Sequence, residues 1–99
     1  MAYNIFCETE KEIHWQKLNL RLQPFSFIEY VPMPGLAING GDALGLSVPQ
    51  KNVGDRAWRE MQIVVEILIN EFQFVLYDMY QGEIIDLESL DNIRAAIGS

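Results

Sequence analysis

The sequence predicts a single α+β domain that occupies residues 1–99. Three observations indicate this fold class. Short segments rich in branched and aromatic residues alternate with a few longer ones, apolar residues in the longer segments recur every three or four positions, and glycines and prolines separate the two kinds. At 99 residues the chain is close to the commonest size of one domain and is too short for two ordinary ones.

The first third of the chain predicts a strand, a helix and a second strand. Residues 3–7 are apolar and aromatic and end where acidic residues begin, which is typical of a short strand. Thr9 followed by Glu12 forms a capping box, a pair that satisfies free N–H groups at a helix start. We therefore expect a helix over residues 10–22, followed after a proline by a strand over residues 25–31.

The middle of the chain predicts turns and two strands. Residues 32–54 contain three prolines and five glycines. The run Asn39-Gly40-Gly41-Asp42 favours a turn, because these residue types tolerate a positive φ. We expect this turn to separate a strand at residues 36–38 from another at residues 43–48.

The clearest helix is predicted over residues 56–72, with Asp55 as its N-cap. One face of this helix carries an apolar stripe, made of Trp58, Met61, Val64, Val65, Leu68 and Phe72. Ile63 and Ile67 fall in the middle of the opposite, polar face, one turn apart. Either another segment of the chain covers these two residues, or they form a second interface with a partner or with a second copy of the chain.

The last quarter predicts a hairpin of strands at residues 74–78 and 83–86, followed by a helix over residues 87–97 with Asp86 as its cap. Apart from the short segment 36–38, the order is β-α-β-β-α-β with an added hairpin strand and a C-terminal helix. This order matches the split βαβ sandwich, called ferredoxin-like, in which two helices cover one face of a four-stranded sheet. That fold carries many unrelated functions and so indicates none of them.

The charge of the chain favours a protein partner. There are 14 acidic against 7 basic residues, for a net charge of −7, and the basic residues are scattered. Nucleic acids and anionic membranes are bound through clusters of Lys and Arg, so both are disfavoured, whereas a basic protein would be attracted. No apolar run approaches the length of a membrane span, residues 1–10 do not resemble a signal peptide, and Cys7 is the only cysteine. We expect a soluble, cytoplasmic protein.

Catalytic chemistry is the alternative to binding. Cys7 and His14 are the only thiol and the only imidazole, but acidic residues beside Cys7 would oppose formation of a thiolate. Asp78 and Glu83 could form a carboxylate pair for acid–base work if their environments separated their pKa values. The spacing of the acids matches no calcium loop, and the glycine run matches no phosphate loop. We therefore expect no metal or cofactor, and no enzyme unless one of these pairs is used.

The predicted partner-binding site is the acidic C-terminal quarter. Aromatic and acidic residues gather there around one tight turn and the start of a helix. We expect them either to form a solvated acidic face or to bind a basic protein, with Tyr80 as a possible anchor. The candidate residues are Tyr77, Asp78, Tyr80, Glu83, Asp86, Glu88 and Asp91.

The chain resembles the small immunity proteins of bacterial contact-dependent growth inhibition and related toxin systems. The resemblance rests on its size, on the opening strand Asn4-Ile5-Phe6-Cys7 that leads into an acidic helix, and on the acidic C-terminal quarter. It implies a protein that binds and neutralises a cognate toxin domain, often a basic nuclease, by covering its active site. A small enzyme and a homodimeric structural module remain the alternatives.

Overall fold

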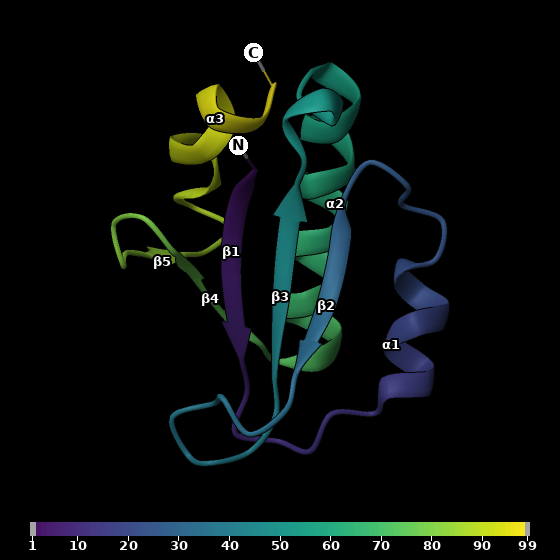
Figure 1. Ribbon diagram of the computed structural model, residues 1–99, viewed down its shortest axis with the longest axis vertical. Helices are drawn as coiled ribbons and strands as arrows, with labels where there is room; N and C mark the ends of the chain where they lie inside the picture. Colours follow the sequence, from purple (N-terminus) through teal and green to yellow (C-terminus); the bar gives the residue numbers. More distant parts are fainter. Residues whose placement is uncertain (1, 99) are drawn as a thin grey trace.

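The computed structural model describes residues 2–98 and confirms an α+β domain (Figure 1). Five strands form one antiparallel sheet in the order β2-β3-β1-β4-β5. The strands are β1 (Tyr3–Glu8), β2 (Glu29–Met33), β3 (Ala43–Val48), β4 (Val75–Asp78) and β5 (Ile84–Ile85). The helices are α1 (Trp15–Leu22), α2 (Asp55–Phe72) and α3 (Arg94–Gly98), with short 3-10 turns at η1 (Gln50–Asn52) and η2 (Leu90–Ile93).

The helices gather on one side of the sheet. In Figure 1, α2 lies behind the sheet along β3 and β2, and α1 lies beyond the β2 edge. Helix α3 is joined to the start of α2 by a hydrogen bond of 2.8 Å from the Gly54 N–H to the Ile97 carbonyl oxygen. None of the helices within residues 2–98 is long and apolar enough to cross a membrane.

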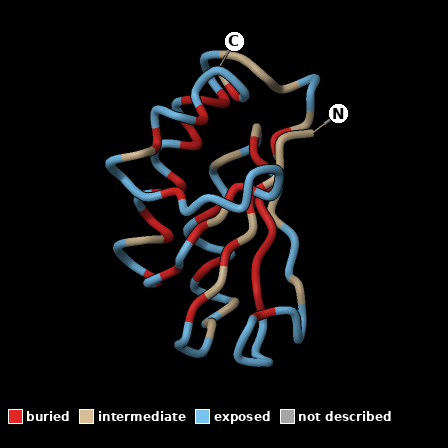
Figure 2. Tube along the Cα trace, turned by 90° about the vertical axis from the view of Figure 1, so that its left-hand side faces the viewer, coloured by how far each residue is buried: buried red, intermediate tan, exposed pale blue. Residues whose placement is uncertain are grey.

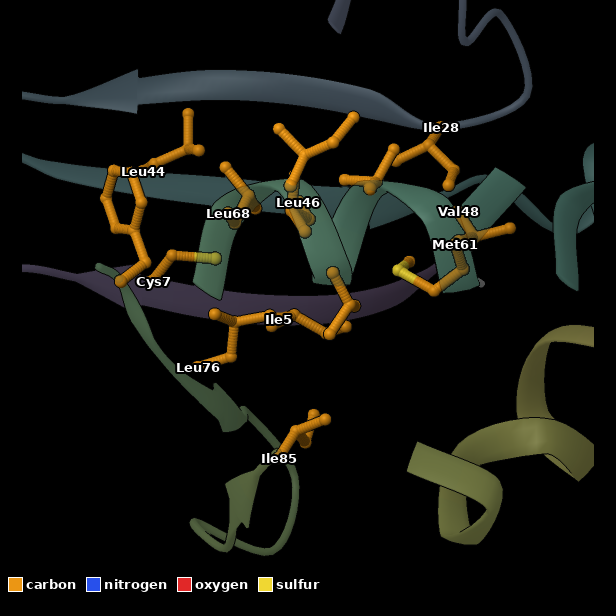
Figure 3. Close-up of a cluster of buried hydrophobic side chains, with 14 of the residues drawn as sticks. Ile5, Cys7, Ile28, Leu44, Leu46, Val48, Met61, Leu68, Leu76 and Ile85 are labelled. Carbon is orange, nitrogen blue, oxygen red and sulfur yellow. The ribbon is translucent and has the colours of Figure 1, made fainter. Parts of the chain in front are cut away.

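The core fills the layer between the sheet and α2. Alternate side chains of the strands point into it, because successive residues of a strand face opposite sides of a sheet. Figure 3 shows them packed against Met61 and Leu68 of α2: Ile5, Cys7, Leu44, Leu46, Val48, Leu76 and Ile85. Figure 2 shows the same division, with buried positions along the central strands and at intervals along the helices. We call this side of the sheet the covered face.

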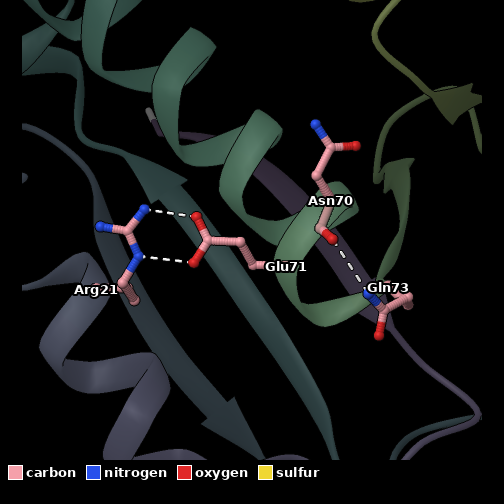
Figure 4. A network of polar contacts seen from close by, with 4 residues as sticks. All are labelled: Arg21, Asn70, Glu71 and Gln73. Atoms are coloured by element: carbon pink, nitrogen blue, oxygen red, sulfur yellow. Dashed lines mark hydrogen bonds and ion pairs between the residues drawn. The ribbon is translucent and has the colours of Figure 1, made fainter.

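Helix α2 is the element that the sequence predicted best. The whole predicted stripe from Trp58 to Phe72 is buried, and the helix ends at the predicted residue. Gln73 ends it by adopting a left-handed conformation with φ of 55°. The Phe74 N–H then donates to the Leu68 carbonyl oxygen at 3.0 Å, and the Gln73 side chain donates to the Asn70 carbonyl oxygen at 3.1 Å (Figure 4).

The first helix begins five residues later than predicted. Thr9 is buried, and its hydroxyl oxygen accepts a hydrogen bond of 3.2 Å from the Lys11 N–H, which closes a local turn instead of capping a helix. The regular helix starts only at Trp15. Ser, Thr, Asn and Asp side chains stabilise turns and helix starts through the same bonds, so the pattern in the sequence could not separate the two.

Among the described residues, one predicted strand is displaced and another is absent. The strand expected over 25–31 lies instead at Glu29–Met33, because the Phe27 N–H donates to the Glu60 carboxylate at 3.0 Å and so ties this stretch to α2. The segment 36–38 forms no strand. Ala37 and Gly41 are bonded to each other across a tight turn at 3.0 Å, which uses the backbone groups that a strand would need. The strand at 43–48 is confirmed.

The C-terminal segment does not form one continuous helix over 87–97 as predicted. It consists of the 3-10 turn η2 followed by one short helix, α3. Leu90, Ile93 and Ile97 nevertheless point inward and are buried, as their spacing predicted.

The predicted stripe of Ile63 and Ile67 is not a surface stripe. Ile67 is only 4% exposed and belongs to the core, whereas Ile63 is 48% exposed. Glu71, one turn after Ile67, binds Arg21 of α1 through two hydrogen bonds of 2.6 and 2.8 Å (Figure 4). Helix α1 therefore lies beside this flank of α2, and the second interface predicted there lacks one of its two residues.

Candidate binding face

Asp78 organises the turn between β4 and β5. Its side chain is only 9% exposed. The carboxylate accepts hydrogen bonds from the Tyr3 hydroxyl at 2.6 Å, the Tyr80 N–H at 2.7 Å and the Gln81 N–H at 3.1 Å. Burial raises the pKa of Asp78, but the three hydrogen bonds together lower it by more, so the pKa lies below its ordinary value. This carboxylate is bound within the chain rather than offered to a partner.

Tyr80 is exposed, yet it is fixed in place. Its hydroxyl donates to the Ala2 carbonyl oxygen at 2.6 Å, and its ring stacks on Tyr3 with 5.9 Å between the ring centroids. Burial, the bond to Asp78 and the nearby charge raise the pKa of Tyr3. Tyr80, Asp78 and Glu83 line a shallow cavity of about 360 Å³ beside α3.

The other predicted site residues do not converge on that cavity. Asp86 accepts hydrogen bonds from the Glu88 and Ser89 N–H groups at 3.0 and 2.8 Å, and the Ser89 hydroxyl accepts from the Asp86 N–H at 3.0 Å. These bonds lower the pKa of Asp86 and close the turn that leads into η2. Glu88 and Asp91 are exposed, and Tyr77 lies on the other face of the sheet from Asp78, its neighbour in β4. The structure therefore divides the predicted site into separate parts.

Neither predicted catalytic pair has the environment that it needs. Cys7 is fully buried in the covered face, and burial raises the pKa of its thiol, which disfavours the reactive thiolate. His14 is exposed just before α1. Asp78 has a lowered pKa, which is the wrong direction for a carboxyl that must hold a proton near neutral pH. Among residues 2–98, no three His, Cys, Asp or Glu side chains gather as a metal site.

The second face of the sheet carries both apolar and polar side chains, and no helix within residues 2–98 covers it. No helix of the described chain lies over it in Figure 1, where it is turned toward the viewer. We call it the open face. The pairing of the strands places on it Asn4, Phe6, Glu8, Glu29, Val31, Met33, Ala43, Gly45, Ser47, Val75, Tyr77 and Ile84.

One register row crosses all five strands of the open face. It runs from β2 to β5 through Val31, Gly45, Phe6, Tyr77 and Ile84, each paired directly with the next. Val31 and Ile84 at its two ends are 52% and 58% exposed. The rings of Phe6 and Tyr77 lie in contact at its centre, with 6.4 Å between their centroids. The row is thus a continuous apolar strip across the sheet.

Gly45 shapes the middle of this row. A Cβ atom at this position would lie 2.8 Å from the Cε atom of Met33, so the Met33 side chain occupies the space that any larger residue would fill. Methionine adapts to irregular surfaces because it is unbranched and flexible. The open face therefore has a deformable apolar side chain beside its aromatic pair.

Basic and acidic residues are distributed differently between the strands and the rest of the chain. All seven basic residues lie outside the strands, namely Lys11, Lys17, Arg21, Lys51, Arg56, Arg59 and Arg94. The charged residues within the strands are Glu8, Glu29 and Asp78, and the first two belong to the open face. Within the strands, every charged residue on the open face is therefore an acid.

The sequence also contains a pattern that indicates this face, namely large apolar residues at adjacent positions of a strand. In β1, Ile5 and Phe6 are both large and apolar although adjacent residues of a strand point to opposite sides. β4 and β5 repeat this with Leu76 and Tyr77 and with Ile84 and Ile85. An antiparallel sheet with one solvated face normally alternates apolar and polar residues. Apolar residues at successive positions thus indicate a second face that is not simply solvated.

Comparisons with protein-family models, with curated proteins and with solved structures each found no match. Function is therefore inferred from the geometry of the chain itself.

Proposed function

We propose that this chain is a protein-binding inhibitor, an immunity protein that binds and neutralises a basic toxin domain through its open face. The observation that carries the proposal is the apolar row across all five strands, on a face whose charged strand residues are Glu8 and Glu29. A contiguous apolar patch of this kind is typical of a surface that another molecule covers.

The residues of the row suit a protein interface. Aromatic residues and methionine are enriched at interface centres, and here Phe6, Tyr77 and Met33 occupy the middle of the face. The flanking Glu8 and Glu29 would disfavour acidic partners and would speed the approach of a basic one. Nucleic acid is disfavoured for the same reason, because its phosphates would meet these carboxylates.

The proposal moves the interface away from the acidic turn. Asp78 and Asp86 are held by hydrogen bonds within the chain, whereas no helix of the described chain covers the apolar row of the open face. Of the residues predicted from the sequence, Tyr77 belongs to the proposed interface, and Glu83 adjoins the β5 end of the row at Ile84. The exposed Glu88 and Asp91 would add only long-range attraction.

The ferredoxin-like assignment is part of the proposal. It is supported by the strand order, in which β1 lies between β3 and β4 and β2 lies at the edge beyond β3. In this assignment β5 and α3 are additions to a split βαβ sandwich. We propose the cytoplasm as the site of action, since a single buried thiol needs no oxidising compartment.

The test is a matched pair of double variants. Val31→Glu with Ile84→Glu places two charges at the ends of the apolar row, at positions exposed enough to keep the fold. Leu20→Glu with Ile63→Glu makes the same change at exposed apolar positions of α1 and α2. The binding partner is isolated from the source cells and identified, and its affinity for each variant is measured by calorimetry.

We expect the open-face variant to lose affinity by about tenfold or more per substitution, because each glutamate replaces an apolar contact by a charge that the partner must desolvate. The helix-layer variant should bind as the wild type does. Thermal unfolding of both variants controls for folding. Equal affinity of the open-face variant and the wild type for an identified partner would refute the proposal.

A further inference from the structure

A hollow of about 270 Å³ lies at one end of the open face. The end of β1, the start of β4 and the loop between β2 and β3 enclose it. Its walls include Glu8, Glu10, Ile38, Val75 and Tyr77. It is slightly smaller than the roughly 300–1,000 Å³ of small-molecule pockets, so it suits one long side chain better than a whole ligand.

Glu8 provides the charge of this hollow. Its carboxylate accepts a hydrogen bond of 3.1 Å from the Ile38 N–H, which holds the β2–β3 loop against the end of β1. Burial raises the pKa of Tyr77, and the charge of Glu8 and a hydrogen bond to it raise that pKa further. An ionised carboxylate has about four acceptor positions, so Glu8 retains capacity for another donor.

Apolar surface surrounds this carboxylate. Ile38 is 88% exposed, the largest exposure among the big apolar side chains described in the structure, and Val75 is 41% exposed. Together with the Tyr77 ring they form the kind of surface on which the aliphatic part of a long basic side chain packs. A guanidinium can also stack on a tyrosine ring while it binds a carboxylate.

The chain supplies no cation of its own to the hollow. The residues that line it within positions 2–98 include the acids Glu8 and Glu10 and no base. Lys11, the nearest base in the sequence, is directed elsewhere, because its Nζ atom donates to the Gln73 side chain at 3.1 Å. The negative charge of the hollow is therefore open to an outside cation.

We propose that this hollow receives an arginine side chain of the basic partner, with its guanidinium on Glu8 and Tyr77 and its aliphatic part against Val75 and Ile38. This proposal rests on the proposed function, since it locates one contact of the same interface. It makes the hollow a specificity site at the edge of the apolar row.

The test uses N-acetyl-arginine methylamide as the probe and N-acetyl-citrulline methylamide as its neutral isostere. Each is added to ¹⁵N-labelled protein, and amide shifts are followed by NMR. We expect the arginine probe to shift the amides of Glu8, Ile38 and Tyr77 in a saturable way, with a dissociation constant on the order of millimolar or weaker. The citrulline probe should leave them unchanged.

Three variants locate the contact. Glu8→Gln keeps an acceptor for the Ile38 N–H but removes the charge, and it should weaken probe binding by about five- to tenfold. Ile38→Ser removes one apolar wall at a highly exposed position and should also weaken binding. Glu12→Gln removes an exposed acid that does not line the hollow, and it should leave binding unchanged.

The proposal is overturned if the probe gives no saturable shifts up to its solubility limit, or if Glu8→Gln binds it as the wild type does. This result is independent of the partner experiment. If the open-face variant loses partner binding but the arginine probe does not bind, the proposed interface is supported and only the arginine site is refuted. If the arginine probe binds but the open-face variant binds the partner as the wild type does, the arginine site is supported and the proposed interface is refuted.

Discussion

Both faces of the sheet carry large apolar side chains, but the helices of the described chain cover only one of them. Ile5 and Phe6 are adjacent in β1 and point to opposite faces. Ile5 is fully buried against α2, whereas Phe6 contacts Tyr77 on a face that no helix of residues 2–98 covers. Burial against α2 accounts for the covered face as part of folding. The open face has no such helix among the described residues, and Val31 and Ile84 at the two ends of its apolar row stay 52% and 58% exposed.

The helical layer and the open face also differ in how their charged residues are paired. Both ion pairs found among residues 2–98, Arg21 with Glu71 and Arg56 with Glu60, belong to the helical layer. The carboxylates of the open face, Glu8 and Glu29, have no base beside them in their own strands. Two acids of the helical layer are thus paired with bases of the same layer, whereas the charged residues on the open face of the strands are all acids.

The largest expected difference between the faces is in stability. Ile5→Ala should lower the free energy of unfolding by about 3–4 kcal/mol, because it leaves a cavity in the layer against α2. Ile84→Ala on the open face should cost less than about 1 kcal/mol, because its side chain is already half exposed. Urea unfolding of both variants measures this. Similar losses from the two changes would show that the open face is part of the core.

Asp78 should show the next largest effect. Asp78→Ala leaves the Tyr3 hydroxyl and two turn N–H groups without their acceptor, and we expect a loss of about 2–3 kcal/mol at neutral pH. The pKa of Asp78 is lowered in the folded state, so its stabilisation is complete above the unfolded pKa of about 4 and is lost as the pH falls through the folded value.

Unfolding of the wild type and of Asp78→Asn at several pH values tests this sign. The difference in stability between them should narrow in acid and be constant from weakly acidic to neutral pH. A difference that widens as the pH falls would contradict the assignment of Asp78 as a charged acceptor in the folded state.

The tyrosines give a matched comparison of intermediate size. Tyr3→Phe removes the donor to the buried Asp78 carboxylate and should cost about 1 kcal/mol. Tyr77→Phe removes a hydrogen bond to the Glu8 carboxylate, which is less buried than that of Asp78, and should cost less than about 0.5 kcal/mol. Chemical denaturation at neutral pH separates the two, and an equal or larger cost for Tyr77→Phe would weaken the distinction between the faces.

The smallest effect is expected at Gly45. A Cβ at this position meets only the flexible end of Met33 as a close neighbour, and that end can move away over the open face. Gly45→Ala should therefore change the free energy of unfolding by no more than about 0.5 kcal/mol. A loss of several kcal/mol, measured by the same denaturation, would mean that Met33 is rigidly packed and that the open face is less deformable than described.

Periodicity made parts of this fold predictable. Helix α2 follows from a stripe of apolar residues at intervals of three and four, and strand β3 follows from its position after the glycine turn. The late start of α1 could not be predicted, because Thr9 serves a local turn whose residue types also cap helices. The displaced β2 strand depends on a bond from Phe27 to Glu60, which are far apart in the sequence.

The candidate site was harder to predict than the fold. The acidic turn was predicted as the site because of its composition. Hydrogen bonds from the Tyr3 hydroxyl and from two backbone N–H groups bind Asp78 within the chain, and composition does not show such bonds. Of the predicted residues, only Tyr77 lies in the apolar row. The row itself depends on strand register, which aligns Phe6 with Gly45 and Tyr77 from distant parts of the chain.

Site-specific photo-crosslinking in the source cells tests most directly whether the open face is the binding surface. A photoreactive phenylalanine is placed at Val31 or Ile84 on the open face, and at Leu20 or Ile63 in the helical layer, all of which are exposed. We predict a crosslinked basic protein, the same one from Val31 and from Ile84, and none from the two helical positions. Crosslinks to a common partner from Leu20 and Ile63 alone would contradict the account.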